Sequence, residues 1–309
     1  MAETDLPEDV ILNILSWLPV KSLIRFTSVS KRFRSIILYD PKLARTQFEA
    51  ACQRKTLSCR LIFHTVTRRL ESLDLDTPSY GDISSSRKLS FPFEEPGSDI
   101  SLLGSCNGLV FVAFGEVDFY IWNPATRFFM ELPKPGFSDG LWLRYYGAGY
   151  LSATDDYKVF AASYDVYGPT REMKMFSLRA HVWKTIQHPG HDKASDEGTL
   201  LNEAIHWLVG NEILAFDFAQ EEFRTMRLPD HHEIQDPFGV GYVGVSEGCL
   251  CVCGHRRSVA VKGVGGEWSL VKIDHKEEEK FLVYTTGGTS FDRYRNMIPY
   301  EESLLRINF

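Results

Sequence analysis

One pattern of apolar residues repeats along most of the chain and restricts the folds that it can adopt. In each copy a short strand-like run is followed by a turn, a second such run and an aromatic residue. The first runs start at residues 108, 157, 204 and 248, so that successive copies begin 44 to 49 residues apart. Strand repeats of this length are typical of β-propellers, in which each blade buries its faces against its neighbours. From about residue 60 onward, the sequence predicts a large all-β, propeller-like domain.

The period is close to that of kelch-type blades, and the parts of the four copies correspond. The rings near the second runs are expected to pack within blades rather than to bind a ligand. Between Ile273 and Tyr300 no complete further copy can be read, so the number of blades, about five, and the closure of the ring stay open. The first runs are Gly108–Phe114, Tyr157–Ser163, Ala204–Gly210 and Gly248–Gly254, and the rings are Phe128 with Phe129, Trp183, Phe223 and Trp268.

The first 45 residues follow a helical period instead. Apolar residues between Leu6 and Leu18 recur at i, i+3 and i+4, with Asp5 as a possible N-cap, and Pro19 ends this segment. Two further short helices are expected at residues 23–29 and 33–37, the last stopping before Asp40 and Pro41. Three helices of this size cannot bury enough apolar surface alone, so they need either the chain's own large domain or a separate partner. We therefore divide the chain into a helical unit (1–45), a linker (46–59) and the β domain (60–309).

The N-terminal stretch LPEDVILNILSWLPVKSLIRFTSVSKRFRSII closely resembles the F-box. The resemblance implies an apolar face that binds a Skp-type adaptor and, through it, cullin and RING subunits. Two positions depart from the usual pattern, because Phe33 stands where the family usually has Trp and Ser28 where it often has Cys; Phe33 keeps an aromatic anchor. The residues that the resemblance assigns to the adaptor contact are Leu6, Pro7, Ile11, Leu15, Leu18, Pro19, Leu23, Val29 and Phe33.

Four stretches of the β region carry a second resemblance: Gly104–Leu109, Trp122–Arg127, Asp155–Val159 and Tyr300–Leu304. They resemble the plant F-box-associated interaction domain found in defence-regulating and pollen S-locus F-box proteins. Together with the F-box, this resemblance accounts for nearly the whole chain.

Composition and charge exclude several classes of protein. No long uncharged apolar run and no basic, apolar leader occurs, so we expect a protein of the cytoplasm or nucleus. Residues 1–60 carry ten Lys or Arg against six Asp or Glu, whereas the rest is strongly acidic, which argues against nucleic acid as a partner of the β domain. Cys249, Cys251 and Cys253 alternate along a strand, a pattern that suits neither a disulfide framework nor a zinc site.

No nucleophile with its base, phosphate loop or metal-ligand spacing can be recognised, so we expect neither catalysis nor a cofactor. The two resemblances imply the substrate-recognition subunit of an SCF-type ubiquitin ligase, with a scaffold protein or a propeller enzyme as alternatives. Target contacts are expected in loops at one rim of the β domain, with Trp142, Tyr145 and Tyr146 as candidate residues. The candidate loops are Phe137–Tyr146, Tyr164–Glu172, Gln187–Glu197 and Pro229–Phe238.

Overall fold

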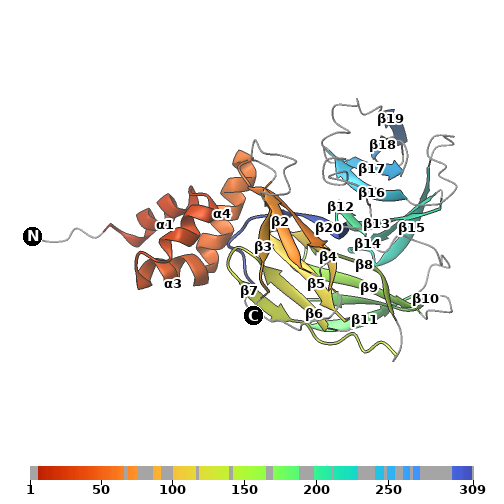
Figure 1. Cartoon of the computed structure of the whole chain (residues 1–309), viewed down its shortest axis with the longest axis horizontal. Helices are drawn as coiled ribbons and strands as arrows, with labels where there is room; N and C mark the ends of the chain where they lie inside the picture. The colour runs from red at the N-terminus through yellow and green to blue at the C-terminus, as the bar shows by residue number, and fades with distance from the viewer. Residues whose placement is uncertain are drawn as a thin grey trace, which may run out of the picture.

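The computed structural model consists of a small helical module followed by a β domain, and Figure 1 shows the helices projecting from one side of the strands. Among the described residues, no helix is long and apolar enough to cross a membrane. The structure describes residues 6–65, 69–74, 86–91, 100–115, 118–138, 142–164, 170–187, 198–210, 212–228, 241–246, 249–254, 260–264, 267–271 and 294–307.

The helical module contains one helix more than the sequence analysis expected. Asp40 and Pro41 were expected to end a helix, but they also begin the next one: the Asp40 carboxylate accepts hydrogen bonds from the backbone N–H groups of Lys42 and Leu43, and Pro41 occupies the first helical position. Most of the predicted 46–59 linker is therefore helical. Asp5 lies outside the described residues, and the first helix starts directly after Pro7 without a side-chain cap. The helices are α1 (Glu8–Ser16), α2 (Val20–Phe26), α3 (Lys31–Tyr39) and α4 (Pro41–Arg54).

The β domain is built from five four-stranded antiparallel sheets, which we number I to V in chain order. In spatial order, sheet I is β20 (Tyr294–Glu301), β1 (Cys59–Thr65), β2 (Leu70–Asp74) and β3 (Arg87–Leu89). Sheet II is β4 (Ile100–Cys106), β5 (Leu109–Phe114), β6 (Asp118–Asn123) and β7 (Phe128–Glu131). Sheet III is β8 (Trp142–Leu151), β9 (Asp156–Tyr164), β10 (Thr170–Ser177) and β11 (Val182–Ile186). Sheet IV is β12 (Thr199–Leu201), β13 (Ala204–Val209), β14 (Glu212–Asp217) and β15 (Glu222–Arg227). Sheet V is β16 (Gly241–Ser246), β17 (Cys249–Gly254), β18 (Ala260–Val264) and β19 (Glu267–Val271).

This architecture confirms the predicted propeller-like all-β fold. The repeated runs of the sequence are the second, third and fourth strands of sheets II to V, whereas the first strand of each sheet was not recognised. Sheet I combines both ends of the domain, because β20 pairs with β1 along the edge where the other sheets have their own first strand. The β domain is thus held by its C-terminal strand.

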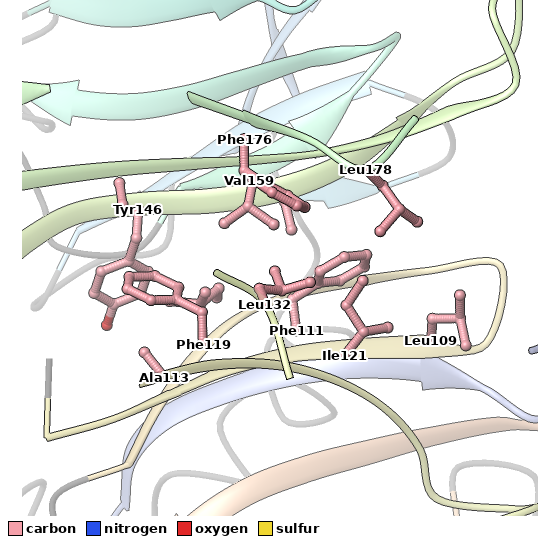
Figure 2. Packing of buried hydrophobic residues seen from close by; sticks show 13 residues of the cluster. Leu109, Phe111, Ala113, Phe119, Ile121, Leu132, Tyr146, Val159, Phe176 and Leu178 are labelled. Atoms are coloured by element: carbon pink, nitrogen blue, oxygen red, sulfur yellow. The ribbon is translucent and has the colours of Figure 1, made fainter. Parts of the chain in front are cut away.

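One apolar cluster fills each described space between neighbouring sheets. Figure 2 shows the cluster between sheets II and III, where Phe111 and Ile121 face Val159 and Phe176. Sheets III and IV enclose a second cluster around Trp207, and similar clusters lie between sheets I and II and between sheets IV and V. Because these side chains are buried between two neighbouring sheets, each blade stabilises the next.

The turns after the third strands repeat the same geometry. β6, β10 and β14 end at Asn123, Ser177 and Asp217, whose side-chain oxygens accept hydrogen bonds from backbone N–H groups two or three residues later. The residue four positions on has a positive φ in every case: 59° at Arg127, 54° at His181 and 57° at Glu221. A short polar side chain that mimics the backbone is suited to begin such a turn.

The two rims of the β domain differ in what they carry. The rim with the turns 107–108, 124–127 and 152–155 meets the helical module, because Asp155 forms an ion pair with Arg45 of α4 at 3.2 Å and Ala125 packs against the helical core. Since successive strands run antiparallel, the connections 132–141, 165–169, 187–198 and 228–240 join strand ends at the opposite rim. We call these the proximal rim and the distal rim.

Candidate functional site

The helical module keeps an unusual amount of apolar surface exposed. Among the described residues, seven of the eleven large hydrophobic side chains that are exposed lie between residues 6 and 39. Monomeric proteins rarely leave such a concentration uncovered, and a local concentration of this kind indicates a protein interface. The seven are Leu6, Val10, Ile14, Trp17, Phe26, Val29 and Tyr39.

The exposed residues of α1 and of the chain before it follow helical spacing. Leu6, Val10 and Ile14 are four residues apart and Trp17 follows three later, so they share one side of the helix, which we call the α1 stripe. A second apolar group, the α2–α3 corner, consists of Phe26, Val29 and Phe33; the rings of Phe26 and Phe33 meet edge to face with centroids 6.4 Å apart. Both groups present side chains that could enter pockets of a partner.

The structure divides the nine predicted adaptor contacts into three groups. Leu15 and Leu23 are 2% and 0% exposed inside the module, so the expectation that they contact the adaptor is corrected: their side chains already fill the helical core. Ile11, Leu18 and Phe33 are partly buried against that core. Leu6, Pro7, Pro19 and Val29 are exposed. The first group supports the surface from behind, the second lies at its edge and is partly accessible, and the third is fully available to a partner.

Five exposed apolar residues were missing from the predicted contact set: Val10, Ile14, Trp17, Phe26 and Tyr39. Two rows of apolar residues run along α1, one through Ile11, Leu15 and Leu18 toward the core and one along the α1 stripe. The second row was visible in the sequence, but it could not be separated from the core-facing row without knowing the position of α4.

Basic side chains surround the α2–α3 corner. They lie on the exposed surface of α2 and α3, whereas the first turn of α1 carries Glu8 and Asp9. Negative charge on a partner surface would therefore favour its binding to α2 and α3. The exposed cations are Lys21, Arg25, Lys31, Arg32 and Arg34.

The chain after β20 connects this module to the β domain. We call residues 302–307 the C-terminal segment. Its Ser303 is fully buried, donates a hydrogen bond to the carbonyl oxygen of Asn107 at 3.0 Å, and accepts one from the backbone N–H of Leu305. The Asn123 amide donates to the carbonyl oxygens of Ser303 at 3.0 Å and Leu305 at 2.8 Å. The C-terminal segment is thereby fixed to the proximal rim.

The same segment completes the core of the helices. Leu304 is 1% exposed among Leu15, Leu23 and Ile37, and Leu305 packs against the same cluster. Arg306 donates to the backbone oxygen of Leu38 at 3.4 Å. The helical module therefore packs on the β domain through the C-terminal segment, and Figure 1 shows the helices beside the strands.

A half-buried carboxylate, that of Glu301, lies at the end of β20, next to this segment. Burial raises the pKa of Glu301 above its usual range. Glu301 thus binds its proton more tightly in the folded chain than in the unfolded chain, and stability contributed by that proton is gained as the pH falls through the folded pKa. We expect Glu301→Gln to raise the free energy of unfolding at pH 7 to 8, by up to about 1 kcal/mol, and to lose this advantage toward about pH 4.

Urea unfolding at several pH values checks this expectation, with the exposed Glu131→Gln as the matched variant. A Glu301→Gln chain that is less stable than the parent at neutral pH would show that the carboxylate makes a favourable interaction when charged.

The three residues predicted to contact the target have different surroundings. Tyr145 is 2% and Tyr146 is 5% exposed, because Tyr145 packs between sheets III and IV and Tyr146 between sheets II and III; this corrects their assignment as contact residues. Trp142 is 48% exposed at the start of β8, on the distal rim. Much of the four candidate loops (139–141, 165–169, 188–197 and 229–238) lies outside the described residues, although the strand ends that flank them all meet the distal rim.

Among the described side chains, no group of three or more His, Cys, Asp or Glu could hold a metal ion. The side chains of Cys251 and Cys253 lie outside the described residues. Cys106 is a free thiol whose pKa is raised by burial, which disfavours the nucleophilic thiolate.

Comparison with known proteins agrees with this arrangement. A model of the F-box domain matches residues 4–45, and a model of the F-box associated beta propeller domain matches residues 62–277. Three similar proteins come from Arabidopsis thaliana. F-box protein CPR1 is 30% identical, over 82% of this chain and 67% of its own length. F-box/kelch-repeat protein At3g23880 is 28% identical, over 73% and 66%. F-box/LRR-repeat/kelch-repeat protein At2g27520 is 27% identical, over 99% and 82%.

The chain thus spans about two thirds of the length of the first two relatives. The F-box model matches the part of the chain that forms the helical module, and the propeller model matches most of the part that forms the five sheets. The chain belongs to the F-box protein family, and it combines an F-box with an F-box associated β-propeller domain.

Proposed function

We propose that this protein is the substrate-recognition subunit of an SCF-type ubiquitin ligase. In this role the F-box binds a Skp-type adaptor, which links it to cullin and RING subunits, and the β domain binds a target protein for ubiquitination. The observation that carries the proposal is the uncovered apolar surface of the α1 stripe and the α2–α3 corner on a module that matches the F-box.

The position of the module supports the proposal. The α1 stripe and the α2–α3 corner remain exposed although the module also packs on the C-terminal segment. The two possibilities raised by the sequence, packing on the own β domain and binding a partner, are therefore compatible. One side of the module holds it in place while the other is free for the adaptor.

The proposed mechanism is proximity. A receptor with two binding surfaces raises the concentration of target lysines near the conjugating enzyme and requires no catalytic residue of its own. The attachment through Ser303, Leu304 and Asn123 would restrict the distance between the target and the adaptor. Such an arrangement favours a defined set of lysines over others.

Binding to a purified Skp-type adaptor tests the proposal. We expect the intact chain to form a stoichiometric complex, and Val29→Asp and Ile14→Asp each to weaken it by about 10- to 100-fold, because a buried unpaired carboxylate replaces an apolar contact. Co-purification followed by calorimetry measures the effect.

Val182→Asp is the matched control, since Val182 is 54% exposed on β11 of the β domain and belongs to neither the α1 stripe nor the α2–α3 corner. This variant should bind the adaptor like the parent chain. If the folded intact protein does not bind, the ligase role fails and a scaffold function without a ligase becomes the better account.

The cations of α2 and α3 give a further expectation for the same complex. If they face an acidic surface of the adaptor, raising the salt concentration should slow association much more than dissociation. Stopped-flow measurements of both rate constants check this, and an association rate independent of salt would contradict a role for these charges.

A further inference from the structure

The distal rim carries one cluster of side chains that the packing of the blades does not explain. Trp142 and Tyr164 are directly opposed at the end of the β8–β9 ladder, and the Arg144 guanidinium lies 4.9 Å from the centroid of the Tyr164 ring and 5.6 Å from that of Tyr145. We call Trp142, Arg144 and Tyr164 the Trp142 cluster. It lies at the end of sheet III opposite the turn that contacts α4.

A local irregularity of β8 places Arg144 there. The pairing with β9 shifts between Leu143 and Tyr145, so that Arg144 is an extra residue without a partner in the ladder. Bulges of this kind redirect a side chain and often accompany functional sites. The next residues, Tyr145 and Tyr146, pack into the two core clusters on either side of sheet III, which fixes the strand on which Arg144 is presented.

The contacts of Arg144 leave its hydrogen-bonding groups unused. Within the described part of the chain, it has ring contacts with Tyr145 and Tyr164 but no hydrogen bond or ion pair, although it is partly buried. Other basic residues near this rim are paired: Lys174 bonds to Glu172 and to two backbone oxygens, and Arg227 pairs with Glu212. A guanidinium that lies over an aromatic ring can still donate hydrogen bonds from the edges of its own plane. The paired N–H groups along such an edge match the two oxygens of a carboxylate.

We propose that the Trp142 cluster binds an aspartate or glutamate side chain of an extended target segment, with an adjacent apolar side chain of that segment on the Trp142 indole. This inference rests on the proposed function, because it names the target chemistry that the β domain recognises. Arg144 supplies paired donors to the carboxylate, and the half-exposed indole supplies the apolar contact.

The charge balance favours a carboxylate over a phosphate. Residues 61–309 contain more Asp and Glu than Lys and Arg, so the β domain as a whole carries a net negative charge, which opposes a doubly charged anion more than a singly charged one. One arginine can offset the single charge of a carboxylate, whereas a phosphate carries nearly two charges and usually needs several cations. The target segment is therefore expected to be acidic without modification.

Selection from a phage-displayed library of random linear peptides on the intact chain in complex with its adaptor tests the inference. We expect enrichment of peptides that combine Asp or Glu with a neighbouring aromatic or branched apolar residue. A synthetic peptide from this pool should bind about tenfold more weakly to Arg144→Gln and to Trp142→Ala. Replacing its acidic residue by the corresponding amide should have the same effect on the parent chain and little further effect on Arg144→Gln.

Arg227→Gln is the matched control, because Arg227 is an exposed arginine at the distal end of β15 that already pairs with Glu212. It should bind the peptide like the parent. Failure to select acidic peptides, or binding that is unchanged in a folded Arg144→Gln chain, would overturn the inference. A peptide that binds only when it carries phosphoserine in place of the acid would also overturn it.

Adaptor binding separates this inference from the proposed function. Arg144→Gln and Trp142→Ala should retain the adaptor fully, since both positions lie on the rim away from the helices. Retained adaptor binding without acidic-peptide selection would reject the Trp142 cluster alone, whereas loss of adaptor binding by the parent chain would reject the ligase role. A purely structural role of Arg144 would lower Tm and leave peptide binding unchanged.

Discussion

Asn123→Ala is expected to lower the free energy of unfolding by about 3 to 5 kcal/mol, because one fully buried amide connects the proximal rim to the C-terminal segment. Its oxygen accepts hydrogen bonds from the N–H groups of Ala125 at 2.9 Å and Thr126 at 3.2 Å, and its nitrogen donates to the oxygens of Ser303 and Leu305. Removing the amide leaves four polar groups without this partner at once. Equilibrium unfolding in urea measures the loss.

Asp217→Ala separates the contribution of the turn from that of the hydrogen bonds to the C-terminal segment. Asp217 begins the corresponding turn of sheet IV and accepts from Ala219 and Gln220, both at 2.9 Å, but it has no contact with the C-terminal segment among the described residues. This variant should lose about 1 kcal/mol, as expected for a turn-capping side chain. The difference between the two variants reports the connection to Ser303 and Leu305.

Asn123→Asp provides a nearly isosteric test of the donor. The aspartate keeps the oxygen that caps the turn but places a second oxygen against two carbonyl oxygens in a buried position. It should destabilise the chain at least as much as Asn123→Ala. An Asn123→Asp chain as stable as the parent would show that Asn123 stabilises the protein through the turn and not through its hydrogen bonds to the C-terminal segment.

The two-part architecture could be predicted because the apolar residues follow a helical period near the N-terminus and a repeated pattern of strands in the rest of the chain. The structure confirms the helical part and the all-β part. It missed α4 since Asp40 and Pro41 can end one helix and begin another. The core-facing residues of α4 also include the polar Gln47 and the small Ala44 and Ala51, which weaken its amphipathic pattern.

The first strand of sheet III, β8, was missed for a different physical reason. It lies against sheet IV, where space is limited. A Cβ atom on Gly147 of β8 would lie 2.6 Å from Cδ1 of Ile205, and one on Gly149 would lie 2.6 Å from Cδ1 of Leu200. Glycine is needed at such close approaches, but it removes the branched and aromatic residues by which a strand is recognised in a sequence.

The exposed apolar surface of the F-box could be located in the sequence, but the side of each helix that forms it could not be predicted. Both rows of α1 are apolar, and the row that becomes core is decided in part by Leu304, a residue far away in the chain. Likewise, the aromatic stretch around Trp142 suggested a target site, yet only the packing between sheets separates the exposed Trp142 from the buried Tyr145 and Tyr146. Patterns along the chain show which residues are apolar. Contacts between distant segments determine which of these residues are buried and which neighbours bury them.

Leu304→Ala is expected to destabilise the helical module by about 2 to 5 kcal/mol, because it opens a cavity in a core that is already small. Leu178→Ala, which removes the same atoms from the cluster between sheets II and III, is the matched variant. Hydrogen exchange measured by mass spectrometry should show faster exchange in α1 and α3 for Leu304→Ala and in the strands of sheets II and III for Leu178→Ala.

The adaptor should reverse much of the effect of Leu304→Ala on exchange in the helices, since a ligand that binds the folded module stabilises it by mass action. It should leave the exchange of sheets II and III in Leu178→Ala unchanged. Equal acceleration of exchange in both parts by Leu304→Ala would instead mean that helices and blades unfold as one unit. In that case the C-terminal segment transmits stability between the helical module and the β domain, and loss of the β domain would also remove the proposed adaptor binding.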